Sequence, residues 1–416
     1  MRAEIIAVGS EMLTPLKVDT NSLFITGRLN EIGLDVAAKT VVGDDRALLA
    51  DVVRQALARA EVVLLTGGLG PTADDVTREA VADALGLPLD EDAAIVQRLE
   101  QRFGRRGLTM PANNRKQALV PRGAVIVPNE KGTAPGLVMA RDGRLVVLLP
   151  GPPRELEPMV EHVVREHLAA FAGPFRLFRR VLRTTGRSES QVDALVQPIY
   201  ARWTSWPTPI QTTILASPGQ IELHLAVRAA DASQAQQVLD AATQEIASAL
   251  GPTLFAVGDR RLEEVVGELL RAQGLTIATA ESCTGGLLAS RLTDVAGSSD
   301  YVERGVVCYS NRAKADLLGV PEATLGEHGA VSEPVAVAMA RGIRERAGTD
   351  LGVGITGIAG PGGGSAAKPV GTVVLALAWA DGERVQTSWF PGERDQVKFF
   401  SSQAALDMVR RRLLGV

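Results

Sequence analysis

Two long stretches of the sequence, residues 3–170 and 258–416, alternate short apolar strands with amphipathic helices. Such alternation is typical of a mostly parallel sheet that helices cover on both faces. Residues 260–274, for example, repeat apolar side chains at helical spacing and end at Gly274, and an apolar strand follows at 275–280. The pattern predicts an α/β protein with one α/β domain at residues 1–170, on a parallel or mixed sheet, and another at 258–416.

The segment between these stretches, residues 171–257, follows a different order of elements. We expect a strand at 175–186, a helix at 188–202, a hairpin that turns at 217–220, a second helix and a last strand. The order βαββαβ is that of a small ferredoxin-like α+β domain. Few chemically active side chains cluster in it, so we predict a structural or dimerising role, and with it a homodimer.

Composition and charge exclude several classes of protein. The 416 residues carry a formal net charge of −4, whereas a general grip on nucleic acid needs clustered Lys and Arg. No apolar run approaches the ~20 residues of a membrane span, and the charged start of the chain does not resemble a signal peptide. Two cysteines cannot build a disulfide framework or a four-cysteine zinc site. We therefore expect a cytoplasmic protein with no membrane or nucleic-acid partner.

The sharpest motif of the C-terminal stretch is Glu281-Ser282-Cys283-Thr284-Gly285-Gly286, between a predicted strand and a predicted helix. Such a turn places Ser282 at the carboxyl end of a strand, where open α/β sheets build their sites. The first turn of a helix leaves N–H groups unsatisfied, so those of Thr284, Gly285 and Gly286 could hold an oxyanion or a phosphate. The alternative is a tight turn in which the serine is incidental.

A nucleophilic serine needs a base, and none of the four histidines lies in a recognisable triad context. Lys314 is the better candidate. If Asn311 caps the next helix, Lys314 lies in its first turn, where the helix dipole and partial burial both favour a neutral amine. Tyr309, at the preceding strand end, could relay the proton or hold the attacked group. The alternative for Lys314 is a surface lysine on an amphipathic helix.

Cys283 is an alternative nucleophile, because a thiol at a helix N-terminus has a lowered pKa. Adjacent residues on such a turn point in different directions, and we favour Ser282. Cys308 lies inside an apolar strand and is expected to belong to the core.

A glycine-rich loop, residues 356–364, follows another predicted strand and includes Gly357, Ala359 and Gly360. Its glycines allow the backbone to approach a ligand closely, although the loop is neither a P-loop nor a dinucleotide fingerprint. A flexible surface loop is the alternative. Arg394 opens the last predicted helix, where it could clamp a phosphate or lie solvated at the surface.

These segments together resemble one family. Five segments are similar, in order, to the C-terminal domain of the CinA family: Glu281–Gly286, Tyr309-Ser310-Asn311 with Lys314, Gly329–Glu333, the glycine-rich loop with Lys368–Thr372, and Arg394 with Val397 and Lys398. That domain is a nicotinamide mononucleotide amidohydrolase. The resemblance implies Ser282 as nucleophile, Lys314 as base and Tyr309 beside them, with Thr284–Gly286 and Gly357–Gly360 around the carboxamide and ribose. No metal or other cofactor is implied for this reaction.

The N-terminal stretch carries its own glycine-rich turn, Gly67-Gly68-Leu69-Gly70-Pro71-Thr72-Ala73-Asp74-Asp75, between a strand and a helix. Its N–H groups could cradle an anion, and Asp75 could hold a divalent cation. Asp74 and Asp75 could instead only stabilise the helix dipole. Two further loops are expected to ring the same nucleotide or phosphate site. The candidate residues are Gly67, Gly68, Gly70, Thr72, Asp74, Gly132, Thr133 and Gly151, with Asp75 for the metal.

This region resembles the molybdopterin-binding-like N-terminal domain of CinA proteins, in segments spread over residues 4–155. Some members of the family hydrolyse ADP-ribose there in a metal-dependent reaction. Thr14-Pro15-Leu16 departs from the Leu-Gly-Gln-like loop of many members, and Pro15 fixes φ and removes a donor.

The sequence thus predicts deamidation of nicotinamide mononucleotide, with ADP-ribose pyrophosphatase activity as an alternative or an addition. A third alternative, prompted by the competence-linked name of the family, is a non-enzymatic partner protein. The acidic balance gives no sign of a DNA-binding face.

Overall fold

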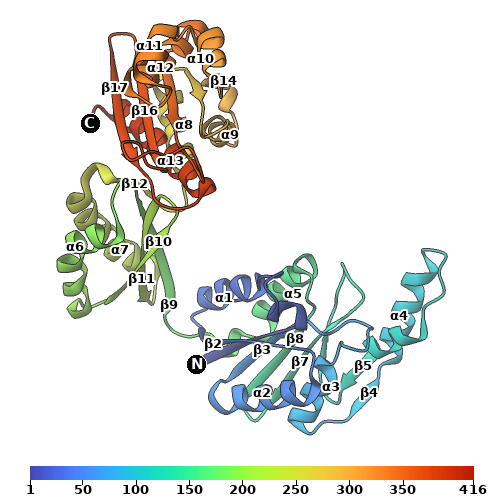
Figure 1. Cartoon of the computed structure of the whole chain (residues 1–416). Coiled ribbons are helices and arrows are strands. Elements are labelled where there is room, and N and C mark those ends of the chain that lie inside the picture. The colour runs from blue at the N-terminus through green and yellow to red at the C-terminus, as the bar shows by residue number, and fades with distance from the viewer. The chain divides into compact units, whose positions relative to one another are not determined.

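The computed structural model describes all residues from 1 to 416. The chain forms two compact units, Met1–Phe178 with Arg228–Gln234, and Arg179–Val227 with Ala235–Val416 (Figure 1). Its elements group into an N-terminal, a middle and a C-terminal domain. Short 3-10 helices supplement the regular elements at Ser10–Leu13, Ala112–Ala118, Ala169–Phe171, Ala201–Ser205, Gly251–Thr253 and Ser298–Asp300.

The N-terminal domain is a six-stranded sheet in the order β2-β1-β3-β8-β7-β6. The first four strands of this order are parallel, and β7 and β6 are antiparallel at one edge. Its elements are β1 (Arg2–Val8), α1 (Asn21–Glu31), β2 (Asp35–Val42), α2 (Arg46–Arg59), β3 (Val62–Thr66), α3 (Thr77–Leu85), β4 (Leu89–Glu91), α4 (Ala93–Gly104), β5 (Leu119–Pro121), β6 (Val125–Val127), β7 (Gly136–Arg141), β8 (Arg144–Leu149) and α5 (Pro153–Glu166). β4 and β5 pair as a separate two-stranded sheet.

Side-chain alternation along the strands fills both faces of this sheet. Ile5 of β1 packs in the core with residues of α1 and α5, and its neighbour Ile6 packs in the core with residues of α2 and α3. All five residues of β3 are buried, as expected for a central parallel strand covered on both sides. The predicted α/β architecture of this domain is confirmed.

The middle domain comprises β9 (Arg176–Thr184), α6 (Glu189–Tyr200), β10 (Ile210–Ser217), β11 (Gln220–Ala229), α7 (Ala232–Leu250) and β12 (Leu254–Val257). Its sheet has the order β10-β11-β9-β12, so β11 lies between the two strands of the first βαβ unit. This is the split arrangement that the sequence predicts. The hairpin pairs Ser217 with Gln220, at the expected turn.

The C-terminal domain is built on a five-stranded sheet in the order β14-β13-β15-β16-β17. Strands β14, β13 and β15 are parallel, and β16 and β17 are antiparallel. Its elements are α8 (Leu262–Gln273), β13 (Ile277–Glu281), α9 (Leu287–Thr293), β14 (Val302–Val307), α10 (Asn311–Leu318), α11 (Glu322–His328), α12 (Glu333–Ala347), β15 (Leu351–Gly357), β16 (Thr372–Trp379), β17 (Gly382–Trp389) and α13 (Arg394–Leu414).

Helices cover both faces of this sheet as well. The core on one face joins strand residues to α8, α9 and α13, and the core on the other face joins them to α10, α11 and α12. Helix α12 approaches β15 so closely that a β-carbon on Gly354 would lie 2.4 Å from the carbonyl oxygen of Ala336. Only glycine allows this contact. The three parallel strands end at Glu281, Val307 and Gly357, along one edge of the sheet.

One helix start differs from the prediction. Ser310, and not Asn311, caps α10, because its hydroxyl accepts a hydrogen bond from the N–H of Ala313 at 3.0 Å. Asn311 is instead the first residue of the helix. Lys314 still lies in the first turn of α10, so the argument from the helix dipole stands with a different cap.

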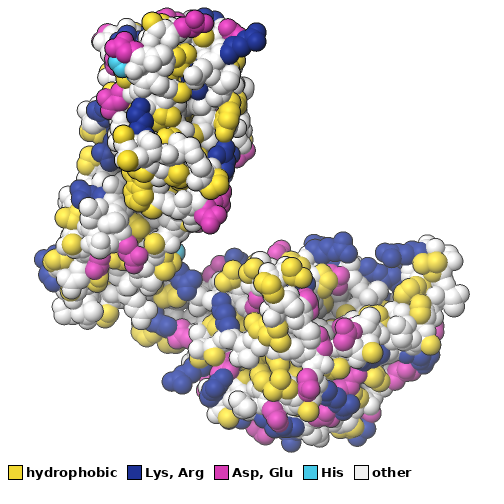
Figure 2. All heavy atoms as spheres, viewed as in Figure 1, with side chains coloured by type: hydrophobic (Ala, Val, Ile, Leu, Met, Phe, Trp, Pro, Cys, Tyr) yellow, Lys and Arg dark blue, Asp and Glu magenta, His cyan; other side chains and the backbone are white.

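No helix of the structure combines the length and the apolarity that a membrane crossing requires. On the face shown in Figure 2, acidic and basic side chains are interspersed.

Candidate active site

Ser282 and Lys314 meet at the carboxyl edge of the C-terminal sheet. The N–H of Ser282 donates to the carbonyl of Ile355 at 2.9 Å, which fixes the residue beside the end of β15. Its Oγ lies 3.0 Å from Nζ of Lys314, a residue 32 positions further along the chain. Ser282 is 7% exposed and Lys314 is 1% exposed. The structure therefore brings together the two side chains that the sequence singles out as nucleophile and base.

The surroundings of Lys314 favour a neutral amine. Nζ donates to the carbonyl oxygens of Cys308 at 3.1 Å and Tyr309 at 3.4 Å, and no carboxylate pairs with it. Burial lowers the pKa of Lys314, since desolvation disfavours the ammonium. In the neutral form, two N–H groups can serve the two carbonyls, and the lone pair is left for the hydroxyl proton of Ser282.

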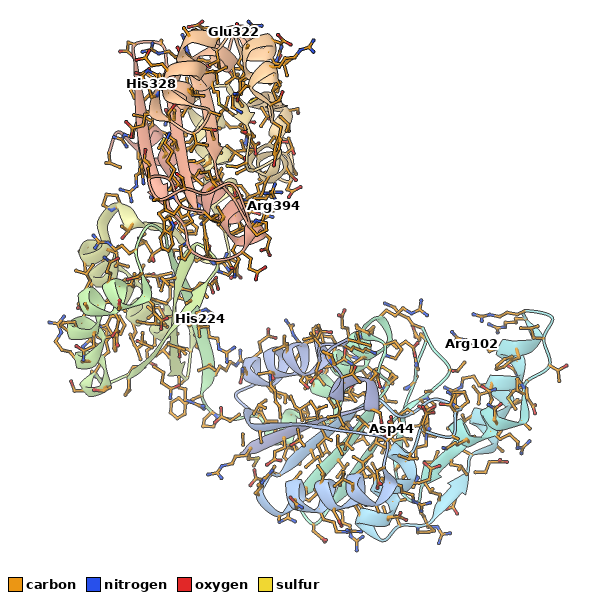
Figure 3. All side chains as sticks on the ribbon, viewed as in Figure 1. Asp44, Arg102, His224, Glu322, His328 and Arg394 are labelled. Atoms are coloured by element: carbon orange, nitrogen blue, oxygen red, sulfur yellow. The ribbon has the colours of Figure 1, made fainter.

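Arg394 ties the other predicted residues to one another (Figure 3). From the first residue of α13, its Nη1 donates to the carbonyl of Gly360 at 2.8 Å and its Nη2 donates to the hydroxyl of Tyr309 at 2.9 Å. Tyr309 is 61% exposed, whereas Ala359 of the glycine-rich loop is buried. The first two of the predicted loop residues 356–364 still belong to β15, which ends at Gly357. Arg394 thus holds Tyr309 and the glycine-rich loop. Its contact with a phosphate stays a prediction.

Glu281 is a residue of this site that sequence reasoning missed. Its buried carboxylate accepts hydrogen bonds from the N–H groups of Gly286 at 3.1 Å, Leu288 at 3.0 Å and Ala289 at 2.8 Å. It therefore occupies the donors of the first turn of α9. A glutamate directly before a strand-to-helix turn was the available signal, because free N–H groups at a helix start attract carboxylates.

This contact corrects part of the predicted oxyanion site. The N–H of Gly286 is taken by Glu281, and the N–H of Gly285 donates to the carbonyl of Ser282 at 3.1 Å. The prediction that these two N–H groups are free was wrong. The N–H groups of Cys283 and Thr284 donate to no oxygen of the chain, and the buried hydroxyl of Thr284 has no hydrogen-bond partner. The donors that remain for an oxyanion come from Cys283 and Thr284.

The two cysteines of the chain are both buried and unpaired. Burial raises the pKa of the Cys283 thiol to about 12, so this thiol stays protonated near neutral pH. A protonated thiol is a poor nucleophile. Cys308 is fully buried, as the sequence predicts for a core residue.

In the N-terminal domain, the glycine-rich turn borders a cavity of about 580 Å³. The predicted residues Gly67, Gly68, Gly70, Asp74, Asp75, Thr133 and Gly151 line it, together with Glu11, Lys17, Asp19, Asp44 and Glu155. Figure 3 labels Asp44 in this domain.

Two residues predicted for this cavity lie outside its lining in the structure. Thr72 does not line it but hydrogen-bonds Asp75, whose Oδ2 accepts the N–H of Thr72 at 2.8 Å and also its hydroxyl. Gly132 lies outside the lining, and Arg102 donates to its carbonyl. No three His, Cys, Asp or Glu side chains of the chain gather in the manner of a metal site. Asp75 as a metal ligand stays a prediction.

Comparison with known proteins covers the whole chain. Three family models match it: "CinA C-terminal domain" at residues 259–413, "Damage-inducible protein CinA KH domain" at 179–256 and "Probable molybdopterin binding domain" at 4–170. A CinA-like protein of Koribacter versatilis is 50% identical over 422 residues, which span 100% of both chains. The chain belongs to the CinA family.

Other members are similar to this CinA-family chain over its length or over one domain. A CinA-like protein of Acidobacterium capsulatum is 46% identical over 100% of both chains. Among solved structures, the competence/damage inducible protein CihA of Agrobacterium tumefaciens is 45% identical over 35% of this chain and 90% of its own, with a TM-score of 0.34. CinA of Thermoplasma acidophilum, described as having unknown function, is 34% identical over 40% of this chain and 98% of its own, with a TM-score of 0.38.

A buried arginine lies behind the N-terminal glycine-rich turn of this CinA-family chain. Arg78 is 0% exposed, and its Nη2 donates to the carbonyl of Leu69 at 2.6 Å. Its Nε and Nη1 have no partner, and burial lowers its pKa to about 10, so the group remains charged at neutral pH. Arg78 was not predicted as a site residue, although it falls within the segment that resembles the family.

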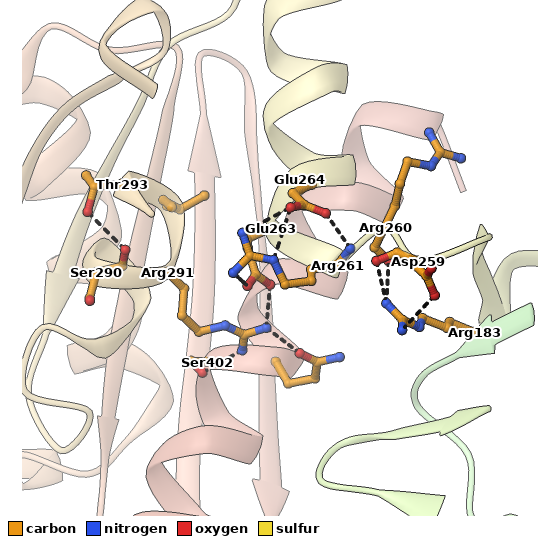
Figure 4. A network of polar contacts seen from close by, with 12 residues as sticks. Arg183, Asp259, Arg260, Arg261, Glu263, Glu264, Ser290, Arg291, Thr293 and Ser402 are labelled. Carbon is orange, nitrogen blue, oxygen red and sulfur yellow. Dashed lines mark hydrogen bonds and ion pairs between the residues drawn. The ribbon is translucent and has the colours of Figure 1, made fainter. Parts of the chain in front are cut away.

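A second buried arginine joins the helices around Ser282. Arg291 of α9 donates to Glu263 of α8 at 2.8 Å, and to Ser402 at 2.8 Å and Gln403 at 2.6 Å in α13 (Figure 4). Breaking a buried ion pair of this kind typically costs about 3–5 kcal/mol. The helix after the Ser282 turn and the helix that begins with Arg394 are therefore held in one arrangement.

The contacts of Glu281 generate the first prediction. In Glu281→Gln, one carboxylate oxygen becomes an amide NH₂ that faces N–H donors, so at least one of the three hydrogen bonds from backbone N–H groups is lost. We expect the free energy of unfolding to fall by roughly 1–3 kcal/mol, and amide hydrogen exchange at Leu288 and Ala289 to accelerate. Exchange measured by NMR or mass spectrometry and thermal unfolding check this result. Glu322→Gln, at the exposed start of α11, is the matched control: it should lower the free energy of unfolding by less than about 1 kcal/mol and leave exchange at Leu288 and Ala289 unchanged.

Proposed function

We propose that the C-terminal domain hydrolyses the carboxamide of nicotinamide mononucleotide to give nicotinate mononucleotide and ammonia. The observation that carries this proposal is the 3.0 Å separation between Oγ of Ser282 and the buried amine of Lys314. Membership of the CinA family supports it, because the motifs of this site are those in which the sequence resembles the amidohydrolase domain of that family. Ser–Lys pairs are a recognised variant of covalent catalysis.

In the proposed reaction, neutral Lys314 takes the proton of Ser282 while Oγ attacks the carboxamide carbon. The negative charge that develops on the carboxamide oxygen is stabilised by the N–H groups of Cys283 and Thr284. Lys314 then returns the proton to the leaving nitrogen, ammonia departs and an ester on Ser282 remains. Lys314 next takes a proton from water, which attacks the ester, and gives that proton back to Ser282 as the nicotinate mononucleotide leaves. One water is consumed and one ammonia released, without a cofactor.

Tyr309 and the glycine-rich loop have supporting parts in this proposal. Tyr309 relays a proton or holds the attacked group, and Arg394 positions its hydroxyl. The backbone at Gly357, Ala359 and Gly360 borders the ribose. Because Arg394 bonds Tyr309 and Gly360 together, the orientation of the tyrosine and the position of the loop are coupled.

The roles of Ser282, Cys283 and Lys314 can be separated by substitution. Ser282→Ala and Lys314→Met should each lower kcat for nicotinamide mononucleotide by about 10³-fold or more, because each removes the nucleophile or its base. Cys283→Ala should retain most of the activity. Ammonia release by the full chain measures the effect, and circular dichroism confirms folding. If Ser282→Ala kept its turnover and Cys283→Ala lost it, the thiol would be the nucleophile.

The lowered pKa of Lys314 predicts the pH dependence of the reaction. The amine acts as a base only when neutral, and the neutral fraction grows as pH rises through its pKa. We therefore expect kcat/KM to rise with pH and to reach its plateau below the ~10.4 of an unperturbed lysine. A pH profile of kcat/KM tests this. A rise confined to the range of an ordinary lysine would contradict a base neutralised by burial.

A second candidate function belongs to the N-terminal domain. We propose that its cavity of about 580 Å³ hydrolyses ADP-ribose to AMP and ribose 5-phosphate with a divalent cation. The glycine-rich turn offers N–H donors for a pyrophosphate, the positive charge of Arg78 lies behind it, and the acidic lining offers oxygen ligands for a cation.

This second function has its own test. Asp75→Asn should abolish AMP formation from ADP-ribose in the presence of Mg²⁺ or Mn²⁺, and a chelator should do the same to the unaltered protein. Asp51→Asn, a change on the outer side of α2 at a carboxylate that is 61% exposed, is the matched control. Chromatography of the products is the measurement. AMP formation that survives both Asp75→Asn and the chelator would exclude the metal-dependent reaction.

A further inference from the structure

The first two turns of α13 present two cations towards the active site. Arg394 and Lys398 are four residues apart and so lie on the same face of the helix. Nζ of Lys398 lies 3.7 Å from the point that a β-carbon on Gly285 would occupy. The ammonium of Lys398 is therefore a neighbour of the turn that carries Ser282.

Lys398 has no partner within the chain, unlike the other cations around this site. Arg394 donates to Tyr309 and Gly360, and Lys314 to Ser282 and two carbonyls. Lys368, which follows the glycine-rich loop, donates to the carbonyls of His328 and Val331. No hydrogen bond or ion pair involves Lys398, and its side chain is half-buried. A half-buried, uncommitted ammonium beside a catalytic turn is available to a ligand.

The turn itself leaves room for such a ligand. Gly285 and Gly286 have φ values of +64° and +94°, a region that favours glycine, so no side chain stands between the turn and Lys398. The turn cannot bind an anion at the N-terminus of α9 in the usual way, because Glu281 already occupies those donors. An anionic group of the substrate therefore needs a separate cation.

We propose that Lys398 binds the 5′-phosphate of the mononucleotide and makes the site selective for a pyridine nucleotide over the corresponding nucleoside. This inference rests on the proposed deamidation at Ser282. A lysine suits the role because its ammonium is a compact point charge that can meet a phosphate from several directions.

The test compares nicotinamide mononucleotide with nicotinamide riboside, which lacks the phosphate. In the full chain, Lys398→Met should lower kcat/KM for the mononucleotide roughly 10- to 100-fold, mainly through KM, and leave kcat/KM for the riboside unchanged. Lys398→Arg should restore most of the loss, because it keeps the charge. Arg341→Met removes an exposed cation of α12 and is the matched control. An equal loss on both substrates, or no loss on the mononucleotide, would overturn the proposal.

A binding measurement separates this proposal from the proposed function. Calorimetry with ribose 5-phosphate should detect one binding event more in the unaltered full chain than in Lys398→Met. Binding to the N-terminal domain should be the same in both proteins. If the protein releases no ammonia from nicotinamide mononucleotide but this event is lost, the deamidation fails and the phosphate site stands. If both proteins bind ribose 5-phosphate identically, the phosphate site is wrong whatever the reaction.

Discussion

The chemistry that we propose for the C-terminal domain depends on the burial of one amine. A lysine with 1% exposure and no carboxylate partner is costly to keep charged, so the fold itself favours the base form of Lys314. The carbonyls of Cys308 and Tyr309, directly after β14, accept hydrogen bonds from Nζ and so offset part of the free-energy cost of burying the amine. Ser282 follows the end of β13, and its Oγ lies next to the same Nζ. The proposed nucleophile and its proposed base are thus placed by adjacent parallel strands of one sheet.

Several parts of this arrangement could be predicted from the sequence. The alternation of strands and helices gives the parallel sheet, and parallel strands end at a common edge, which brings Ser282 near Lys314 although 32 residues separate them. The same reasoning places the glycine-rich loop after β15 at that edge. These predictions succeed because they need only the direction of the strands and not the orientation of any side chain.

The features that could not be predicted depend on side-chain direction. Glu281 could face either side of the strand end, and only the structure shows that it folds back onto the N–H groups of α9. Ser310 and Asn311 are both good caps, and the choice between them depends on where β14 ends. In the N-terminal domain, Thr72 lies within the glycine-rich turn but hydrogen-bonds Asp75 instead of facing the cavity. A sequence motif predicts that a turn forms, but it does not determine the direction in which each side chain and N–H group of the turn points.

The glycine-rich turn of the N-terminal domain and the turn after Ser282 both contain the sequence Thr-Gly-Gly-Leu, at residues 66–69 and 284–287. They differ in the charged side chain that is buried behind them. Behind the N-terminal turn is a buried cation, Arg78, whose charge adds to the attraction of the backbone N–H groups for an anion. Behind the C-terminal turn is a buried anion, Glu281, which consumes most of those N–H groups and cancels the positive end of α9. The first turn is therefore suited to a phosphate that stays bound as an anion. The second suits the neutral carboxamide of the proposed reaction, on which negative charge would develop only as Ser282 attacks, close to the N–H groups of Cys283 and Thr284.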